Sequence, residues 1–204
     1  MDYFKLRSGY LVTPLLLIAN CLVFIALVIV SQSFSQFHSS TLLKFGANYS
    51  GLVDQGEVWR LLSSVFLHFS VTHLLFNSVS LVILGRFIEP LLGTTAFLAV
   101  YLLAGIAGSA ASYLFNPGVL SAGASGAIFG LFGVFIAILL GKMIRPDVRN
   151  AWAKNIATIL ILNLGMGLIL PVDNAAHIGG LISGIILGLM LVPLMKKRLL
   201  RHLV

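Results

Sequence analysis

Ser125 and His177 are the residues of this sequence whose types can combine into nucleophilic chemistry. A serine hydroxyl is a poor nucleophile until a base takes its proton, and an imidazole is the side chain that most often does so. Both residues lie in apolar stretches, where a polar side chain is costly and is by default a functional candidate. The pair therefore predicts acyl transfer, with Ser125 as the attacking group and His177 as the base.

Acyl transfer also needs hydrogen-bond donors aimed at the negative oxygen that develops on the intermediate. Ser125 opens a predicted helix within Gly123-Ala124-Ser125-Gly126, so its backbone N–H lies at the favourable end of the helix dipole. His73 and Asn77 are four residues apart and therefore project from one helical face. Together these donors complete a site that could hydrolyse an acyl bond.

The composition restricts the class of protein in which this chemistry takes place. The chain has 204 residues, of which 59% are apolar and 9% charged, and its mean hydropathy is +1.05. Because an ordinary soluble domain carries roughly 25% charged residues, a disordered tail, a disulfide scaffold and a cytosolic enzyme are excluded. The single cysteine, Cys21, can form no internal disulfide and is assigned to packing. The sequence therefore predicts an integral membrane protein.

Six apolar segments are predicted to cross the membrane as helices, since about 20 residues span the hydrocarbon core. They cover residues 11–30, 67–85, 95–115, 125–141, 155–170 and 175–195. The predicted fold is an all-α polytopic bundle that forms a single membrane domain over residues 1–204. A long outer loop follows its first helix, and its fourth helix is short.

Basic residues indicate the orientation of the bundle. Eleven of the 13 Lys and Arg residues share one side of the six-helix topology, and only Lys44 and Arg60 fall on the other. The eleven include Lys5 and Arg7 before the first helix, Arg86 in the loop after the second, and two larger groups after the fourth and sixth. Cytoplasmic segments are enriched in Lys and Arg, so both termini are predicted to be cytoplasmic. This placement, rather than nucleic-acid binding, accounts for the net charge of +7.

The candidate residues are predicted to lie at a similar depth in the membrane. At a rise of ~1.5 Å per residue, Ser125 lies about 24 Å, His177 about 28 Å and His73 about 20 Å above the inner boundary. The fourth helix is also shorter than the roughly 30 Å core, so it starts below the outer surface. Irregular backbone at that depth must be buried in protein or line an aqueous cavity. We therefore expect a recessed, water-filled pocket that opens to the outer side.

Further residues are predicted to support the pair. Asp173 is placed in the outer loop and is not expected to complete a triad, so a Ser–His dyad is favoured. Phe129, one turn after Ser125, is expected to stack on His177 and hold the imidazole. Two ridges of small residues would let the fourth and sixth helices pack closely. These ridges are Gly126 with Gly130, and Gly180 with Gly184 and Gly188.

Each residue taken alone also has a structural interpretation. A serine in a glycine-rich segment such as that around Ser125 is commonly a packing residue. His68 is interpreted as a structural residue that bonds loop backbone, and Trp59 with Arg60 can serve as an interfacial anchor. The catalytic hypothesis therefore depends on the combination of polar groups at one depth.

Taken in order, these motifs resemble those of the rhomboid intramembrane serine proteases, over about residues 11–195. The matching segments are Trp59-Arg60, His73-Leu-Leu-Phe-Asn77, Glu89 with Gly93, Gly123-Ala124-Ser125-Gly126 and Ala176-His177-Ile178-Gly179-Gly180. The resemblance is to compact bacterial members with a six-helix core, and no motif residue departs from the family pattern.

The resemblance implies that Ser125 is the nucleophile and His177 the general base. It further implies that His73, Asn77 and the Ser125 amide form the oxyanion hole. The expected activity is cleavage of single-span membrane proteins within or beside their transmembrane helix. No metal or organic cofactor is expected, and the expected surroundings are a lipid bilayer.

Structural roles are implied for several other positions. Trp59 and Arg60 resemble the structural residues of the family's first loop, and Glu89 resembles a hydrogen-bonding partner near the cytoplasmic side. Supporting positions at the site are Gly123, Gly126, Phe129, Gly180 and Gly184. The expected location is the cell membrane, with the site opening outward. Two alternatives remain: a catalytically silent relative that binds client transmembrane helices, and a small transporter or channel.

Overall fold

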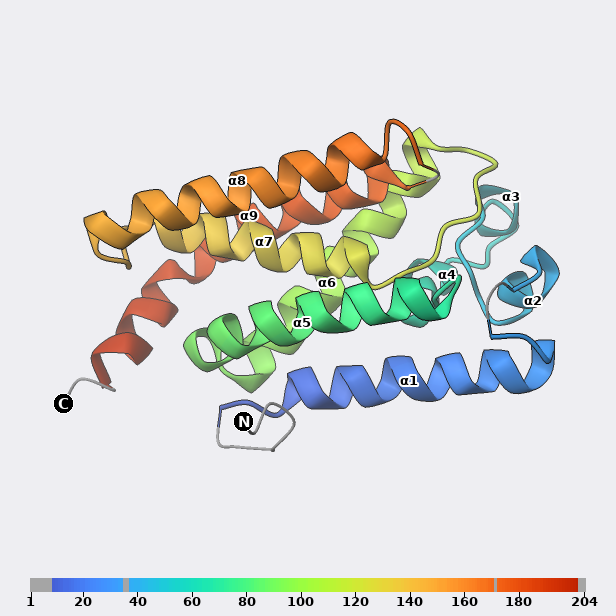
Figure 1. The fold of residues 1–204 in the computed structure, drawn as a ribbon, viewed down its shortest axis with the longest axis horizontal. Helices are drawn as coiled ribbons and strands as arrows, with labels where there is room; N and C mark the ends of the chain where they lie inside the picture. Colours follow the sequence, from blue (N-terminus) through green and yellow to red (C-terminus); the bar gives the residue numbers. More distant parts are fainter. Residues whose placement is uncertain (1–8, 35–36, 171, 202–204) are drawn as a thin grey trace.

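Every regular element in the described part of the chain is a helix (Figure 1). The computed structural model describes residues 9–34, 37–170 and 172–201. In chain order the elements are α1 (Val12–Ser31), α2 (Ser39–Lys44), α3 (Ser50–Val53), α4 (Arg60–Ser63), the 3-10 helix η1 (Ser64–Phe66), α5 (Val71–Leu92), α6 (Thr94–Phe115), α7 (Ser125–Leu140), α8 (Pro146–Met166) and α9 (Asn174–Arg201). The predicted all-α fold class is confirmed.

The six long helices run along the length of the molecule, and the short helices gather at one end of it (Figure 1). The short helices belong to the segment between α1 and α5, which the sequence predicted as the long outer loop. Of the described helices, α1, α5, α6 and α9 are long and apolar enough to cross a membrane, and α7 is a shorter apolar helix of 16 residues. The protein is thus a polytopic helical bundle, and a count of six spans remains a prediction.

Helix α5 is displaced along the chain relative to the predicted 67–85 helix. It begins after Ser70, whose hydroxyl accepts a hydrogen bond from the His73 N–H at 3.2 Å and so caps the helix. At its other end the helix continues through Arg86 and includes Pro90. The prediction that Arg86 lies in a loop is therefore wrong.

Helices α8 and α9 also differ from the predicted 155–170 and 175–195. Helix α8 starts earlier and ends earlier, so Arg149 and Lys154 lie in a helix and not in a loop. Helix α9 continues to Arg201. The predicted bounds stop at charged residues because charge is costly in hydrocarbon. A helix can nevertheless extend past the hydrocarbon core, where its charged side chains reach water.

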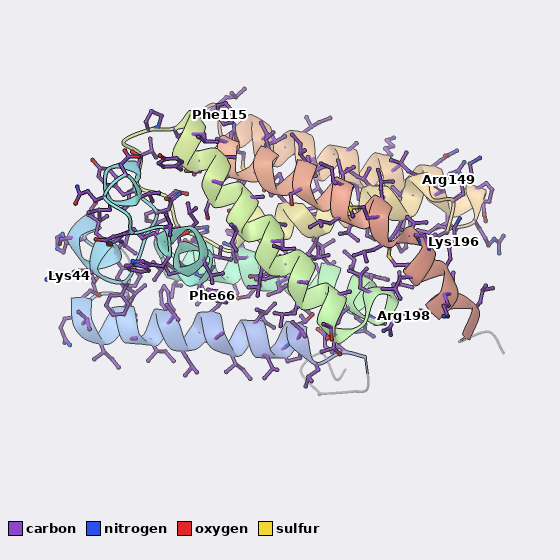
Figure 2. All side chains as sticks on the ribbon, turned by 180° about the vertical axis from the view of Figure 1, so that it is seen from behind. Lys44, Phe66, Phe115, Arg149, Lys196 and Arg198 are labelled. Carbon is purple, nitrogen blue, oxygen red and sulfur yellow. The ribbon has the colours of Figure 1, made fainter. Side chains whose placement is uncertain are left out.

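Basic side chains gather at one end of the bundle, as Figure 2 shows for Arg149, Lys196 and Arg198. Lys44 lies at the opposite end, beside the short helices. Lys5 and Arg7, which also supported the predicted orientation, lie outside the described residues. The charge asymmetry of the described part matches the pattern expected of a cytoplasmic end, and the orientation itself remains a prediction.

Helix α7 is enclosed on all sides by the rest of the bundle. Its residues are buried almost without interruption from Gly126 to Leu139. A helix that is apolar all round is typical of a core position, and α5, α6, α8 and α9 all pack against it. Ser125 therefore begins a helix that the other elements surround.

Helices α7 and α9 approach each other backbone to backbone. A Cβ atom on Gly180 would collide with the Gly126 carbonyl and lie 3.2 Å from the Gly126 Cα. A Cβ atom on Gly184 would collide with the Gly130 carbonyl and lie 2.6 Å from the Gly130 Cα. Only glycine leaves room for this contact, so the close packing predicted from the two glycine ridges is confirmed.

Glu89 of α5 caps the N-terminus of α1. The residue is fully buried, and its Oε1 accepts hydrogen bonds from the N–H groups of Leu11 and Val12 at 2.6 Å each. Its Oε2 accepts from the N–H and the hydroxyl of Thr13 at 2.9 and 2.7 Å. The first N–H groups of a helix have no partner within the helix, and a carboxylate there interacts favourably with the helix dipole. These contacts agree with the hydrogen-bonding role that the resemblance implies for Glu89.

Replacing Glu89 by alanine is expected to lower the free energy of unfolding by about 3 kcal/mol, because four donors, three of them in buried contacts, lose their acceptor. Thermal unfolding of the purified protein in detergent micelles would measure the loss. Asp147→Ala is the control, since this carboxylate is exposed and pairs with Arg145 at 2.9 Å; its expected cost is below about 0.5 kcal/mol. Equal shifts for the two variants would contradict the capping role.

Candidate active site

Ser125 follows an irregular segment that the outer loop holds in place. The Gly123 N–H donates to the Ser64 carbonyl at 2.9 Å, and Asn48 and Ser121 exchange two backbone hydrogen bonds of 2.9 Å. Gly123 has a φ of +143°, a conformation that L side chains rarely adopt. Ser125 itself is partly exposed, whereas the helix that follows it is buried. The serine is thus at the accessible end of an enclosed helix.

His177 lies in the first turn of α9 and is 6% exposed. Its imidazole stacks on the Phe129 ring, with the ring centroids 4.1 Å apart and the planes inclined by 7°. Phe129 lies one turn after Ser125, so this stacking holds the imidazole beside the start of α7. The backbones on either side are also close: a Cβ atom on Gly126, next to Ser125, would lie 3.5 Å from the carbonyl oxygen of Ala176, next to His177. The predicted stacking on Phe129 is confirmed.

No hydrogen bond joins Ser125 to His177 in the described structure. The Ser125 hydroxyl has no hydrogen-bond partner among the described residues, and Nδ1 of His177 is buried without one. Catalytic hydrogen bonds are often long in substrate-free enzymes and tighten when substrate binds. The structure therefore brings the two side chains to the same end of the bundle, where no hydrogen bond joins them in the absence of substrate.

His73 reaches the same place from α5. A Cβ atom on Gly123 would lie 3.0 Å from Nε2 of His73 and 3.6 Å from Oγ of Ser125. Nδ1 of His73 accepts a hydrogen bond from the Phe69 N–H at 3.4 Å, which assigns the proton of the neutral ring to Nε2. The Phe69 ring also stacks on His73, with centroids 5.9 Å apart. His73 therefore presents an N–H donor on the Ser125 side of its ring.

Asn77 lies one turn further along α5 and is 6% exposed. Its Nδ2 donates to the backbone carbonyl of His73 at 2.9 Å. A side-chain amide carries two N–H groups, so one donor remains after this bond. The sequence correctly places Asn77 next to His73, but it gives no sign that the amide bonds back to its own helix.

His68 packs behind His73. The residue is fully buried between η1 and α5, and the two imidazole rings meet edge to face with centroids 5.2 Å apart. Burial lowers the pKa of His68 to about 3, and His73 adds to this effect, so the ring is neutral at physiological pH. Neither ring nitrogen has a hydrogen-bond partner of ordinary geometry in the described part of the chain. The Phe66 backbone nevertheless interacts with the ring and partly opposes the lowering of its pKa, so the predicted contact with loop backbone remains a prediction, and the packing agrees with a structural role.

Trp59 and Arg60 lie in the outer loop, away from the serine. Arg60 is 5% exposed, and its guanidinium donates to the carbonyls of Leu43 and Ala47 at 2.7 and 3.1 Å. It also contacts the Glu57 carboxylate at 2.6 Å and lies 4.7 Å from the centre of the Trp59 ring. These contacts hold the end of α2 against the start of α4, as expected of structural loop residues.

Asp173 lies immediately before α9, in the loop position that the sequence predicted. Its Oδ1 accepts hydrogen bonds from the Ala176 N–H at 3.1 Å and from Nδ2 of Asn116 at 2.8 Å. An Asp three residues before a helical N–H is a common N-cap, so the spacing of Asp173 and Ala176 is a sequence signal for this role. Asn48 was also missed: its Nδ2 donates to the Ser109 carbonyl at 2.8 Å and ties the outer loop to α6. No local sequence pattern predicts that contact, because the two residues are 61 positions apart.

The arrangement contains the types of group that acyl chemistry requires. A partly exposed hydroxyl, a stacked imidazole and an N–H donor from a third helix converge at the open end of α7. Within the described ranges, no cluster of three or more His, Cys, Asp or Glu side chains is arranged to hold a metal ion.

A helical bundle with several membrane-length helices, with Ser125 at the accessible end of the enclosed helix α7 and His177 in the first turn of α9, defines a polytopic membrane protein with a polar site. A family model, the rhomboid domain, matches residues 55–194. The chain therefore belongs to the rhomboid family.

Named relatives agree with this membership. The chain is 44% identical over 168 residues to the Bacillus subtilis (strain 168) protein named Rhomboid protease GluP, covering 80% of this chain and 32% of that protein. It is 35% identical over 205 residues to RHOMBOID-like protein 7 of Arabidopsis thaliana, covering 88% and 66%. It is 37% identical over 148 residues to the putative rhomboid protease YdcA of Bacillus subtilis, covering 72% and 73%. The first two matches thus span about one third and just under two thirds of the relative's length.

Proposed function

We propose that this protein is an intramembrane serine endopeptidase that cleaves single-span membrane proteins within or next to their transmembrane helix. The observation that carries the proposal is the stacking of His177 on Phe129, one turn from Ser125. It holds a base beside the only hydroxyl in the first turn of α7. The rhomboid family membership and the protease names of two relatives support the same activity.

In the proposed reaction, Oγ of Ser125 attacks the carbonyl carbon of the scissile peptide bond as its proton passes to the imidazole of His177. The C–N bond then breaks, and the imidazolium gives this proton to the leaving amine. Water next attacks the acyl–Ser125 ester and loses a proton to His177. The ester C–O bond breaks, and the proton returns to Oγ, which restores both side chains.

Stabilisation of the oxyanion falls to donors from two helices. The Ser125 N–H is free of helical partners because it lies in the first turn of α7. Nε2–H of His73 lies on the same side of Gly123 as the serine hydroxyl, and the second N–H of Asn77 is the third donor. Preorganised donors of this kind are each worth about 100- to 1000-fold in rate.

The proposed location of the site is the outer part of a cell membrane, with both chain termini on the cytoplasmic side. Helix α7 has 16 residues, or about 24 Å at 1.5 Å per residue, which is less than the roughly 30 Å hydrocarbon core. If its C-terminus lies at the basic end of the bundle, Ser125 is below the opposite surface. Water must then reach the site from that side, which suits hydrolysis of a helix that enters from the bilayer.

Reconstitution with a tagged single-span substrate tests this function. The purified protein in detergent or liposomes is expected to cut the substrate at one position in or beside its apolar helix. Binding of the substrate without cleavage would favour a catalytically silent, helix-binding relative. Solute flux through liposomes without any cleavage would favour a transporter or channel.

A further inference from the structure

The carboxylate of Asp173 is held in a fixed position at the start of α9. Its Oδ1 accepts two hydrogen bonds, from the Ala176 N–H at 3.1 Å and from Nδ2 of Asn116 at 2.8 Å. Asn116 lies at the C-terminal end of α6, so the carboxylate is fastened from two helices. Its second oxygen, Oδ2, is buried and has no hydrogen-bond partner among the described residues. One oxygen thus fixes the group, and the other is left with its charge uncompensated.

His177 offers a matching unpaired atom one turn away. The His177 N–H donates to the Asp173 carbonyl at 3.2 Å, which places the two residues four apart on the same helical turn. Nδ1 of His177 is buried and, within the described chain, also lacks a hydrogen-bond partner. Two buried polar atoms of complementary character, neither with a hydrogen-bond partner among the described residues, therefore belong to residues one helical turn apart.

Few other charges reach the imidazole. Among the described residues, the groups whose charge acts on His177 are Asp173 and His73 of α5. Helix α7 has no acidic or basic side chain, and the ionisable groups of α6 are the tyrosines Tyr101 and Tyr113. Tyr113 donates to Asp54 at 2.6 Å, and α8 carries its charged residues in its first half. Within the described ranges, Asp173 is therefore the carboxylate whose field acts on His177.

We infer that Asp173 is a positioning residue for the proposed reaction: its fixed carboxylate stabilises the imidazolium that forms when His177 takes the Ser125 proton. This inference rests on the proposed function. The action is electrostatic, across a gap without a hydrogen bond in the resting structure, and it requires no movement of the carboxylate during the reaction. A charge that is already oriented costs no reorganisation when the imidazolium appears. The dyad thus has a third participant that touches neither the serine nor the substrate.

Replacing Asp173 by asparagine tests the inference, because the amide oxygen can still accept the two hydrogen bonds while the charge is removed. We expect kcat to fall about 3- to 10-fold with KM unchanged, since only the charged intermediate loses stabilisation. A neutral residue also favours the neutral imidazole, so the acidic limb of the kcat/KM profile should move to lower pH by about half a unit or more. Asp173→Ser keeps a capping oxygen without charge and should behave like Asp173→Asn.

The control is Asp54→Asn, which removes a carboxylate of the outer loop and is expected to leave both kcat and the pH profile unchanged. A fall in kcat with an unmoved acidic limb would reduce Asp173 to a helix cap and overturn the inference, as would two variants that behave like wild type. Labelling of Ser125 by a fluorophosphonate over the same pH range provides a second readout without a helical substrate. If wild type neither cleaves nor labels, the proposed function fails and this inference fails with it. If wild type is active and the acidic limb of the Asp173 variants does not shift, this inference is refuted while the proposed function stands.

Discussion

Ser125→Ala is expected to reduce cleavage of a reconstituted single-span substrate by at least about a thousandfold, to the detection limit. Removal of the nucleophile from a serine hydrolase leaves only the rate supplied by binding and the oxyanion hole, and losses of ~10⁶ in kcat are known for such groups. Nothing else in the first turn of α7 carries a hydroxyl, so no neighbour can substitute. The variant should also lose all labelling by a fluorophosphonate, which reacts with the activated serine.

His177→Ala is expected to match that loss, because the serine then has no base within reach. The double variant should be no slower than either single one, since residues that act as a unit are not additive. Ser121→Ala is the matched control: Ser121 lies in the same approach to α7 but uses its backbone for the bridge to Asn48. Cleavage or labelling that survives Ser125→Ala would end the catalytic proposal, whatever the behaviour of His177.

The grouping of the site residues could be predicted because a helix has a fixed rise per residue. Counting from the basic end of each helix placed Ser125, His177 and His73 at a common depth, and the structure brings the side chains of His73 and Ser125 to the same side of Gly123. Periodicity likewise predicted the glycine contact between α7 and α9. Both inferences use local geometry, which the sequence contains in full.

Contacts between distant segments could not be predicted in the same way. Glu89 and the N–H of Val12 are 77 residues apart, and their hydrogen bond is what permits a buried carboxylate in α5. When the sequence is considered without that partner, the charged residues Arg86 and Glu89 indicate the end of an apolar helix. The predicted helix therefore ends too early. The bond of the Asn77 amide to its own helix and the full burial of the His68 ring depend in the same way on packing around them.

The short length of α7 explains why the outer loop packs against the start of that helix. If α7 starts at one face of the hydrocarbon core, its 16 residues do not reach the other face, and its first turn then has to be shielded by other elements. The outer loop does this through Ser64 and Asn48, which hold the segment before Ser125 by backbone hydrogen bonds. The loop is therefore part of the site, although none of its residues provides a reacting group.

Gly184→Ala is expected to separate α7 from α9 and to impair both folding and catalysis. The added Cβ meets the Gly130 backbone, which no rotamer change can move aside, so the helices must shift. Overpacking of this kind costs about 2–3 kcal/mol, equivalent to a fall on the order of 5–10 °C in the apparent Tm of a chain of this size. The same shift moves His177, two turns away on α9, relative to Ser125, so cleavage per folded molecule should also fall.

Gly165→Ala provides the matched control for that variant. Gly165 also lies in a long helix, α8, but a Cβ atom there would meet nothing within 4 Å. Alanine is a better helix former than glycine by up to about 1 kcal/mol, so this variant should be as stable as wild type or slightly more so, with unchanged cleavage. Thermal unfolding in detergent and cleavage by the same preparations separate the two variants. If Gly184→Ala behaved like Gly165→Ala, the backbone contact between α7 and α9 would not be what aligns the histidine with the serine.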